Sequence, residues 1–187
     1  RELDAGNVLL WRHTPARLEA EVVRDSILAV AGQLNTRMGG PGFRDFNMYK
    51  HKGSWVYDPI DPEGAEANRR SIYRTWARGN VHPLLAPLDC PDPSATAPVR
   101  SVTTTPLGAL SLLNTSFVLR MSDHFADRVR GEAGEDAGAQ VRRAFQLAFD
   151  REPNPEELAL TTEFVGASGL AALCRVLFNS NEFLYLN

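Results

Sequence analysis

The longest periodic run of apolar residues extends from Leu107 to Val129, and it constrains the fold more than any other stretch. Thr105-Pro106 precedes it with the hydroxyl cap and first-turn proline of a helix start. We therefore predict a central helix, divided into two pieces at residues 114–116 (Asn-Thr-Ser). Its apolar positions recur every three or four residues, as on one face of an amphipathic helix: Leu107, Leu110, Leu113, Phe117, Met121, Phe125 and Val129.

A second amphipathic segment lies near the start of the chain. Between Leu18 and Leu34 apolar residues again recur at helical spacing, and Thr14-Pro15 has the same pattern of cap and proline. The polar positions in this segment, Arg24 and Asp25 among them, are expected to face solvent. The pattern predicts a helix that begins near residue 14 and ends before the glycine-rich loop at residues 38–42.

Three shorter helices are predicted after residue 138. The second begins with the capping box of Asn154 and Glu157, and Ser168 is expected to cap the third. Short connections between them favour a compact helical end. We expect six inward-facing side chains to be buried together: Leu110, Phe117, Met121, Phe125, Phe145 and Leu173.

The middle of the chain has the pattern of short strands. Residues 43–60 combine aromatic and β-branched side chains, bounded by Gly53 and by Asp58-Pro59. Residues 71–76 alternate in the same way, which predicts a strand that pairs with residues 54–58 in a small antiparallel sheet. A helix over residues 65–78 is the alternative.

Five prolines between residues 79 and 105 prevent regular structure beyond one turn near residues 84–88, because each removes an amide donor and restricts φ. The predicted fold class is therefore mainly α, a helical domain with a small antiparallel β-sheet around residues 43–76 and a long proline-rich loop at 79–105. We expect a single domain over residues 1–187, with one helix and the sheet in 1–105 and a helical part in 106–187. Ordered loops of this length are often functional.

Composition excludes some classes of partner. The formal net charge of −3 is too balanced to favour nucleic acid or an anionic membrane as the main partner. No run of eighteen apolar residues occurs, so no membrane insertion is expected. The chain begins at Arg1 without a methionine or an apolar signal segment, and we expect it to be a C-terminal fragment of a longer multidomain protein.

Polar side chains concentrate around the proline-rich loop. Asp89 and Asp92 lie three residues apart, and paired carboxylates can bind a hard cation or serve as acid and base. The alternative is structural, with these carboxylates paired to nearby arginines so that they hold irregular backbone in place. The candidate polar site comprises Arg70, Arg74, His82, Asp89, Asp92, Arg100 and Thr103.

No complete catalytic signature is present, so enzymatic activity stays an open question and a non-catalytic role is favoured. The chain lacks the G-x-S-x-G and H-E-x-x-H motifs, and it lacks the C-x-x-C-H motif that attaches c-type haem. We expect no metal and no cofactor in this chain. The carboxylates beside Cys90 disfavour a thiolate nucleophile. Cys174 is expected to be a buried free thiol, with a disulfide to Cys90 as the alternative.

Several blocks of the sequence resemble one known family. They are RLEAEVVRDSILAVAGQLN from Arg17, MGGPG at 38–42, RRSIYRTW at 69–76, LDCPDPS at 88–94, RSVTTTPLGALSLLN at 100–114 and LFNSNEFLYLN at 177–187. In their order and spacing the chain is similar to the planctomycete-type domain of unknown function at the C-terminus of large secreted, cytochrome c-associated multidomain proteins.

The resemblance implies an exported location, in the periplasm or at the cell surface, with upstream domains of the same polypeptide as partners. Some members of that family carry a carbohydrate-binding module further upstream, so a polysaccharide is an alternative partner. The resemblance supplies no catalytic residue and no haem ligand in this segment. Two functional hypotheses follow: a non-catalytic structural or interaction module, or a hydrolase or polysaccharide-active domain with its site in residues 69–105.

Overall fold

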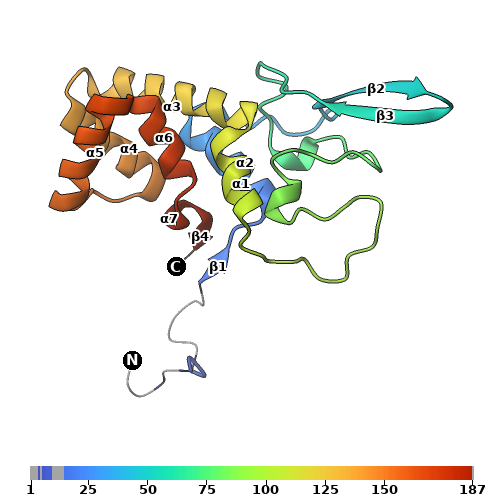
Figure 1. Cartoon of the computed structure of the whole chain (residues 1–187), viewed down its shortest axis with the longest axis horizontal. Helices are drawn as coiled ribbons and strands as arrows, with labels where there is room; N and C mark the ends of the chain where they lie inside the picture. Colours follow the sequence, from blue (N-terminus) through green and yellow to red (C-terminus); the bar gives the residue numbers. More distant parts are fainter. Residues whose placement is uncertain (1–3, 5, 10–14, 187) are drawn as a thin grey trace.

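The computed structural model describes residue 4, residues 6–9 and residues 15–186. The helices are α1 Ala20–Val30, α2 Pro106–Asn114, α3 Ser116–Ala133, α4 Ala137–Phe149, α5 Pro155–Ser168, α6 Leu170–Phe178 and α7 Asn181–Leu184. The strands are β1 Ala16–Arg17, β2 Phe46–His51, β3 Ser54–Pro59 and β4 Tyr185–Leu186. Helices α3 to α6 pack together at one end of the molecule, and the β2–β3 hairpin projects from the other (Figure 1). The predicted class, mainly α with a small antiparallel sheet, is confirmed.

The helical end is built around α3 and α6. Phe125 of α3 stacks on Phe178 of α6, with 5.4 Å between the ring centroids. Five of the six predicted core residues are buried, but Leu110 is 54% exposed. The reason is the break at Thr115, whose extended backbone interrupts the helical phase between α2 and α3. Helix α2 therefore buries Leu112 rather than Leu110. The prediction was wrong for Leu110 because it assumed that one apolar face continues from α2 into α3.

The first helix begins later than its sequence pattern predicts. It starts at Ala20, while Thr14 lies outside the described residues. Residues 16–17 form β1, which pairs antiparallel with β4 at the opposite end of the chain. The Leu18 amide also donates to the Leu184 carbonyl at 2.8 Å. Hydrogen bonds from the C-terminal strand thus keep this segment extended, and local spacing cannot reveal such a distant partner.

The small sheet is a single hairpin. Strands β2 and β3 pair from Phe46↔Pro59 to His51↔Ser54. Lys52 and Gly53 at its turn both have positive φ, as a two-residue type I′ turn requires. Residues 71–76 do not join this sheet, so that part of the prediction was wrong, and the alternative helix over 65–78 does not form either.

Residues 71–73 instead form the short 3₁₀ helix η1 (Ser71–Tyr73), which lies against α1. Residues 86–88 form a second one, η2 (Ala86–Leu88), as the single turn predicted near residues 84–88. Beside it the side chains of Leu84, Leu85 and Leu88 are buried in the core. These leucines anchor the start of the proline-rich loop to the helical part of the molecule.

The last helices are close to the predicted ones. Asn154 and Glu157 form the expected capping box at the start of α5. The cap of α6, however, is Gly169 rather than Ser168, because Ser168 still belongs to α5 and Gly169 adopts a positive φ of 86° between the two helices. A glycine tolerates this conformation without a steric penalty.

Candidate functional site

A buried ion pair lies at the base of the hairpin. Asp45 immediately precedes β2, and its Oδ2 accepts a hydrogen bond from Nε of Arg74 at 2.6 Å. Nε2 of His82 lies 3.2 Å from the same oxygen. Burial would raise the pKa of Asp45, but the contacts from His82 and Arg74 outweigh it, so the pKa is lowered. The carboxylate therefore stays charged and anchors two segments of the loop region.

His82 has both ring nitrogens engaged. Its Nδ1 accepts hydrogen bonds from the backbone amides of Leu84 and Leu85, each at 3.1 Å. An acceptor at Nδ1 places the ring hydrogen on Nε2, which faces Asp45. Neither nitrogen is free to take a proton from a substrate, so the geometry is that of a structural histidine.

Two arginines, Arg24 and Arg69, are buried. Arg24 of α1 donates to the carbonyls of Ala67 and Arg69 at 2.8 and 3.0 Å, and its guanidinium lies over the Phe43 ring. Arg69 donates to carbonyls of the glycine-rich loop, including Pro41 at 2.7 Å. The predicted solvent exposure of Arg24 was wrong, because a guanidinium can satisfy several carbonyls of irregular backbone at once.

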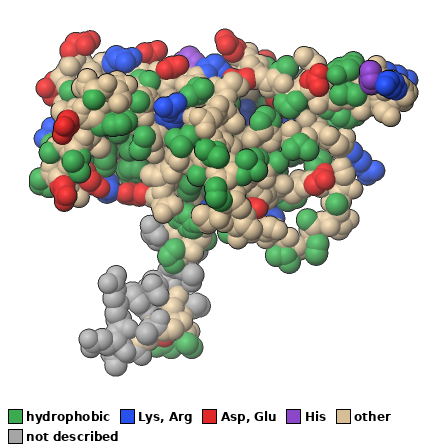
Figure 2. Space-filling model, in the orientation of Figure 1, with side chains coloured by type: hydrophobic (Ala, Val, Ile, Leu, Met, Phe, Trp, Pro, Cys, Tyr) green, Lys and Arg blue, Asp and Glu red, His purple; other side chains and the backbone are tan. Residues whose placement is uncertain are grey.

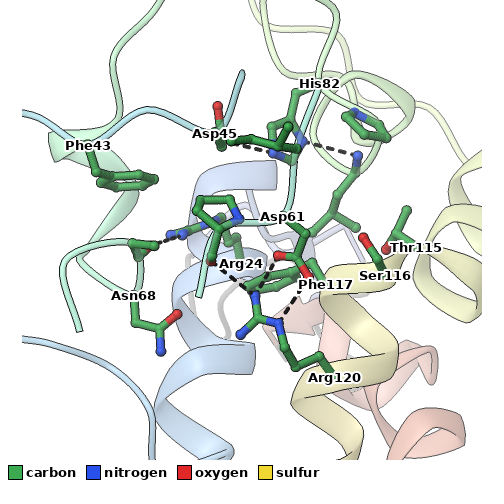
Figure 3. A pocket seen from close by; sticks show the side chains of 15 residues that line it. Arg24, Phe43, Asp45, Asp61, Asn68, His82, Thr115, Ser116, Phe117 and Arg120 are labelled. Carbon is green, nitrogen blue, oxygen red and sulfur yellow. Dashed lines mark hydrogen bonds and ion pairs between the residues drawn. The ribbon is translucent and has the colours of Figure 1, made fainter. Parts of the chain in front are cut away.

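Arg24, Asp45 and His82 line a small cavity (Figure 3). Its volume is about 40 Å³, which suits ordered water and is far below the size of a ligand pocket. Oδ1 of Asp45 and Oδ1 of Asn68 are buried beside it and accept no hydrogen bond from the described residues. On the other side of the cavity, Arg120 of α3 pairs with Asp61, which follows β3. Polar contacts around the cavity therefore connect the base of the hairpin to the helices.

Asp89 forms a second structural connection, which we call the Asp89 clip. Its carboxylate accepts hydrogen bonds from Nη2 of Arg17 at 2.6 Å and from the amide of Thr103 at 2.7 Å, and the Thr103 hydroxyl donates at 2.8 Å. Burial would raise the pKa of Asp89, but the bonds from Thr103 and Arg17 lower it. The clip ties β1, the end of η2 and the end of the proline-rich loop together.

An open groove lies between α1 and the proline-rich loop. Val22, Ile72 and Trp76 line its apolar part, and residues 90–97 line the loop side. Its volume is about 730 Å³, within the range of ligand and peptide sites. Residues between 70 and 100 form much of the wall of this groove.

Charged pairs follow the rim of this groove. Arg100 donates two hydrogen bonds to Glu21 at 2.8 and 3.0 Å. Asp25, predicted to be solvated, is only 18% exposed and accepts from the amide and hydroxyl of Ser71, both at 2.7 Å. Nε of Arg70 approaches Asp25 at 3.7 Å. Although burial would raise the pKa of Glu21, the Arg100 contact outweighs it and the pKa is lowered.

Both cysteines are free thiols, as predicted for Cys174, so the alternative of a disulfide is not realised. Burial, together with nearby Glu21, raises the pKa of Cys90 to about 12. Such a thiol is protonated at neutral pH and a poor nucleophile.

The predicted polar site is divided among three places. Arg74 and His82 meet at Asp45, whereas Asp89 and Thr103 meet at the Asp89 clip. The remaining predicted residues line the groove: Arg70, Asp92 and Arg100. Asp92 is exposed, and within the described part of the chain its carboxylate contacts only Ser94 two residues later, whose amide donates at 2.7 Å. The two aspartates therefore have different environments and do not form a paired carboxylate site.

Sequence reasoning missed the partners of these residues. Asp45 stands in a predicted strand region, Arg17 and Glu21 stand in a predicted helix, and nothing local distinguishes them from solvated charges. The predicted aspartate partners Arg70, Arg74 and Arg100 pair with other carboxylates. The one sequence signal for these arginine–carboxylate pairs is the number of arginines near irregular backbone.

Among the described residues, no three His, Cys, Asp or Glu side chains gather as metal ligands. In the same part of the chain no helix is both long and apolar enough to cross a bilayer. Fold and site together define a mainly helical domain with internally paired charges.

A family model described as PSD1, protein of unknown function (DUF1553), matches residues 1–165. The match covers most of the 187 residues, and the chain belongs to that family. Comparison with curated proteins and comparison with solved structures gave no match.

Proposed function

We propose that this chain is a non-catalytic interaction module of an exported, cytochrome-associated multidomain protein. The observation that carries the proposal is the pairing of three acids with arginines of the same chain. Glu21, Asp45 and Asp89 each accept a hydrogen bond from an arginine of the same chain. A general acid or base works best with a pKa near the operating pH, whereas the pKa values of these three groups are lowered.

The other candidate catalytic groups support the same proposal. His82 uses Nδ1 for two backbone amides and Nε2 for Asp45. The raised pKa of Cys90, about 12, opposes thiolate formation. Catalysis by either residue would require the surrounding structure to rearrange first.

The groove is the surface that we assign to the interaction. Val22, Ile72 and Trp76 are all exposed apolar side chains there, and the pairs of Arg100 and Asp25 lie at its rim. An apolar centre within a polar rim is the usual anatomy of a protein interface. The partner proposed is an upstream domain of the same polypeptide. This partner and the exported, cytochrome-associated setting rest on the family resemblance.

A polysaccharide-active domain is the second candidate, and Trp76 is the observation that favours it. Trp76 is 39% exposed and lines the groove, where Asp25 and Asp92 also lie. An aromatic face beside carboxylates and arginines suits a saccharide, because it offers apolar contact together with polar partners.

Calorimetry with separately produced proteins tests the first candidate. The 187-residue chain is titrated into the upstream portion of its parent polypeptide. Ile72→Glu should weaken binding at least about tenfold, because it replaces an aliphatic contact worth about 1.5–3 kcal/mol by a charge. Leu160→Glu is the matched control, since Leu160 is similarly exposed but lies on α5.

The outcomes separate the two candidates. Equal binding by Ile72→Glu and the unmodified chain, or no association at all, would contradict the interaction module. Release of reducing sugar from a polysaccharide, lost in Asp25→Asn, would support the second candidate instead.

A further inference from the structure

The β2–β3 hairpin projects away from the body of the molecule (Figure 1), and its aromatic side chains Tyr49 and Trp55 are exposed. Cross-strand neighbours share one face of a sheet. The register therefore places Met48 beside Tyr57, and Lys50 beside Trp55, on the same face. Trp55 is 52% exposed, and the ammonium of Lys50 lies 5.2 Å from its ring centroid. One aromatic ring and one positive charge thus lie together at the hairpin end.

The opposite face is also open and also aromatic. Tyr49 pairs with Val56 across the strands there, and Tyr49 is 45% exposed. A two-stranded hairpin by itself has marginal stability in water. Contacts with another surface would therefore stabilise an element that has exposed side chains on both faces.

The hairpin end is positively charged, although the whole chain is not. Lys50 and Lys52 are the only lysines in the sequence, and no Asp or Glu occurs between Phe46 and Tyr57. Within the described part of the chain the salt bridges involve arginine or histidine and neither lysine. In Figure 2 the Lys and His side chains gather at the end of the hairpin. A formal net charge of −3 conceals this local concentration of positive charge.

We propose that the hairpin docks on an anionic lipid surface through the headgroups. Tryptophan and tyrosine favour the headgroup level of a bilayer, where an apolar ring and a polar tip are both accommodated. Lysines near an anionic leaflet gain favourable electrostatic energy. Trp55 and Lys50 already lie at one depth in the hairpin, so both requirements are met without rearrangement.

The distribution of the exposed rings favours lipid over a protein partner. A flat protein surface would cover one face of the hairpin, either that of Trp55 or that of Tyr49. A hairpin end that enters a headgroup layer is surrounded on both faces at once. Lipid contact therefore explains why both faces carry exposed rings and why the end of the hairpin is positively charged. This proposal concerns the hairpin alone and is independent of the interaction proposed for the groove.

Co-sedimentation of the 187-residue chain with vesicles tests the proposal. The vesicles contain equal parts of phosphatidylglycerol and phosphatidylcholine, and vesicles of phosphatidylcholine alone are compared. Binding should occur only to the anionic vesicles and should weaken as salt is added. The variant Lys50→Gln/Lys52→Gln should bind about 25-fold more weakly, since each basic residue contributes roughly fivefold near an anionic surface.

The matched control is Arg78→Gln/Arg142→Gln, which removes the same charge from exposed positions outside the hairpin. This variant should bind like the unmodified chain. Brominated phosphatidylglycerol should quench tryptophan fluorescence, and Trp55→Phe should abolish that quenching. Circular dichroism checks that every variant is folded.

Three results would overturn the proposal. The first is failure of the unmodified chain to bind anionic vesicles. The second is equal loss of binding in the lysine and arginine variants, or quenching that persists in Trp55→Phe, because another surface would then make the contact. The third is binding to soluble heparin without binding to vesicles, which would assign the hairpin to an acidic polymer.

Discussion

Replacing Asp89 by asparagine should destabilise the protein by about 2–3 kcal/mol. The carboxylate accepts from Arg17 Nη2 at 2.6 Å and from the Thr103 amide at 2.7 Å. Hydrogen bonds to a charged group each contribute about 1.5–3 kcal/mol, and asparagine can preserve only part of this pattern because one of its two terminal atoms is a donor. Asp89 has a φ of 61°, a conformation that asparagine also tolerates, so the backbone adds little to the loss.

Thermal unfolding followed by circular dichroism measures this effect. For a chain of this size, 1 kcal/mol corresponds to roughly 2–4 °C in Tm, so Tm should fall by roughly 4–12 °C. The pKa of Asp89 is lowered in the folded state. Its stabilisation is therefore fully present above the unfolded pKa, about 3.9, and is lost as pH falls through the folded pKa. The difference between the two proteins should narrow in that acidic range.

Asp92→Asn is the matched control. Asp92 lies in the same loop but is exposed, and among the described residues its carboxylate contacts only Ser94, two residues later, so its replacement should leave Tm unchanged. The sequence pattern assigns a stabilising role to Asp92 as readily as to Asp89. An Asp89→Asn protein that melts like the unmodified one, or an Asp92→Asn protein that melts as early as Asp89→Asn, would refute the clip.

Three further outcomes are expected. Phe125→Ala should cost about 3–5 kcal/mol, because Phe125 is fully buried against Phe178, whereas Leu110→Ala should change the urea midpoint little; similar midpoints for both variants would contradict the core assignment. Asn154→Ala should lower stability by about 1 kcal/mol through loss of the α5 capping box, and an unchanged Tm would argue against the box. Alkylation of the unfolded, unreduced protein should add two labels, one each at Cys90 and Cys174. The native protein should react slowly, because burial raises the pKa of both thiols. If the unfolded protein takes up no label, the two cysteines form a disulfide.

The candidate site shows where sequence reasoning stopped. The proline-rich segment could be singled out from its residue types, and Arg70, Asp92 and Arg100 do line one groove. Their neighbours could not be foreseen, because Asp89 pairs with Arg17, which lies 72 residues away, and Arg74 pairs with Asp45 across 29 residues. Ion pairs depend on three-dimensional proximity, and the sequence around a charged residue does not identify the residue that it pairs with.

Local patterns were enough to predict where α2, α3 and α5 begin. The proline after Thr105, the break at Thr115 and the capping box at Asn154 act within one turn of backbone, so residues close in sequence decide them. Contacts between distant segments decided the rest. Extended residues 16–17 exist because β4 pairs with them, and residues 71–73 became a 3₁₀ turn against α1 rather than a strand. Arg24 lies inside because carbonyls of residues 67–69 surround it. Each of these outcomes depends on hydrogen bonds with partners far along the chain, which only the folded structure brings within reach.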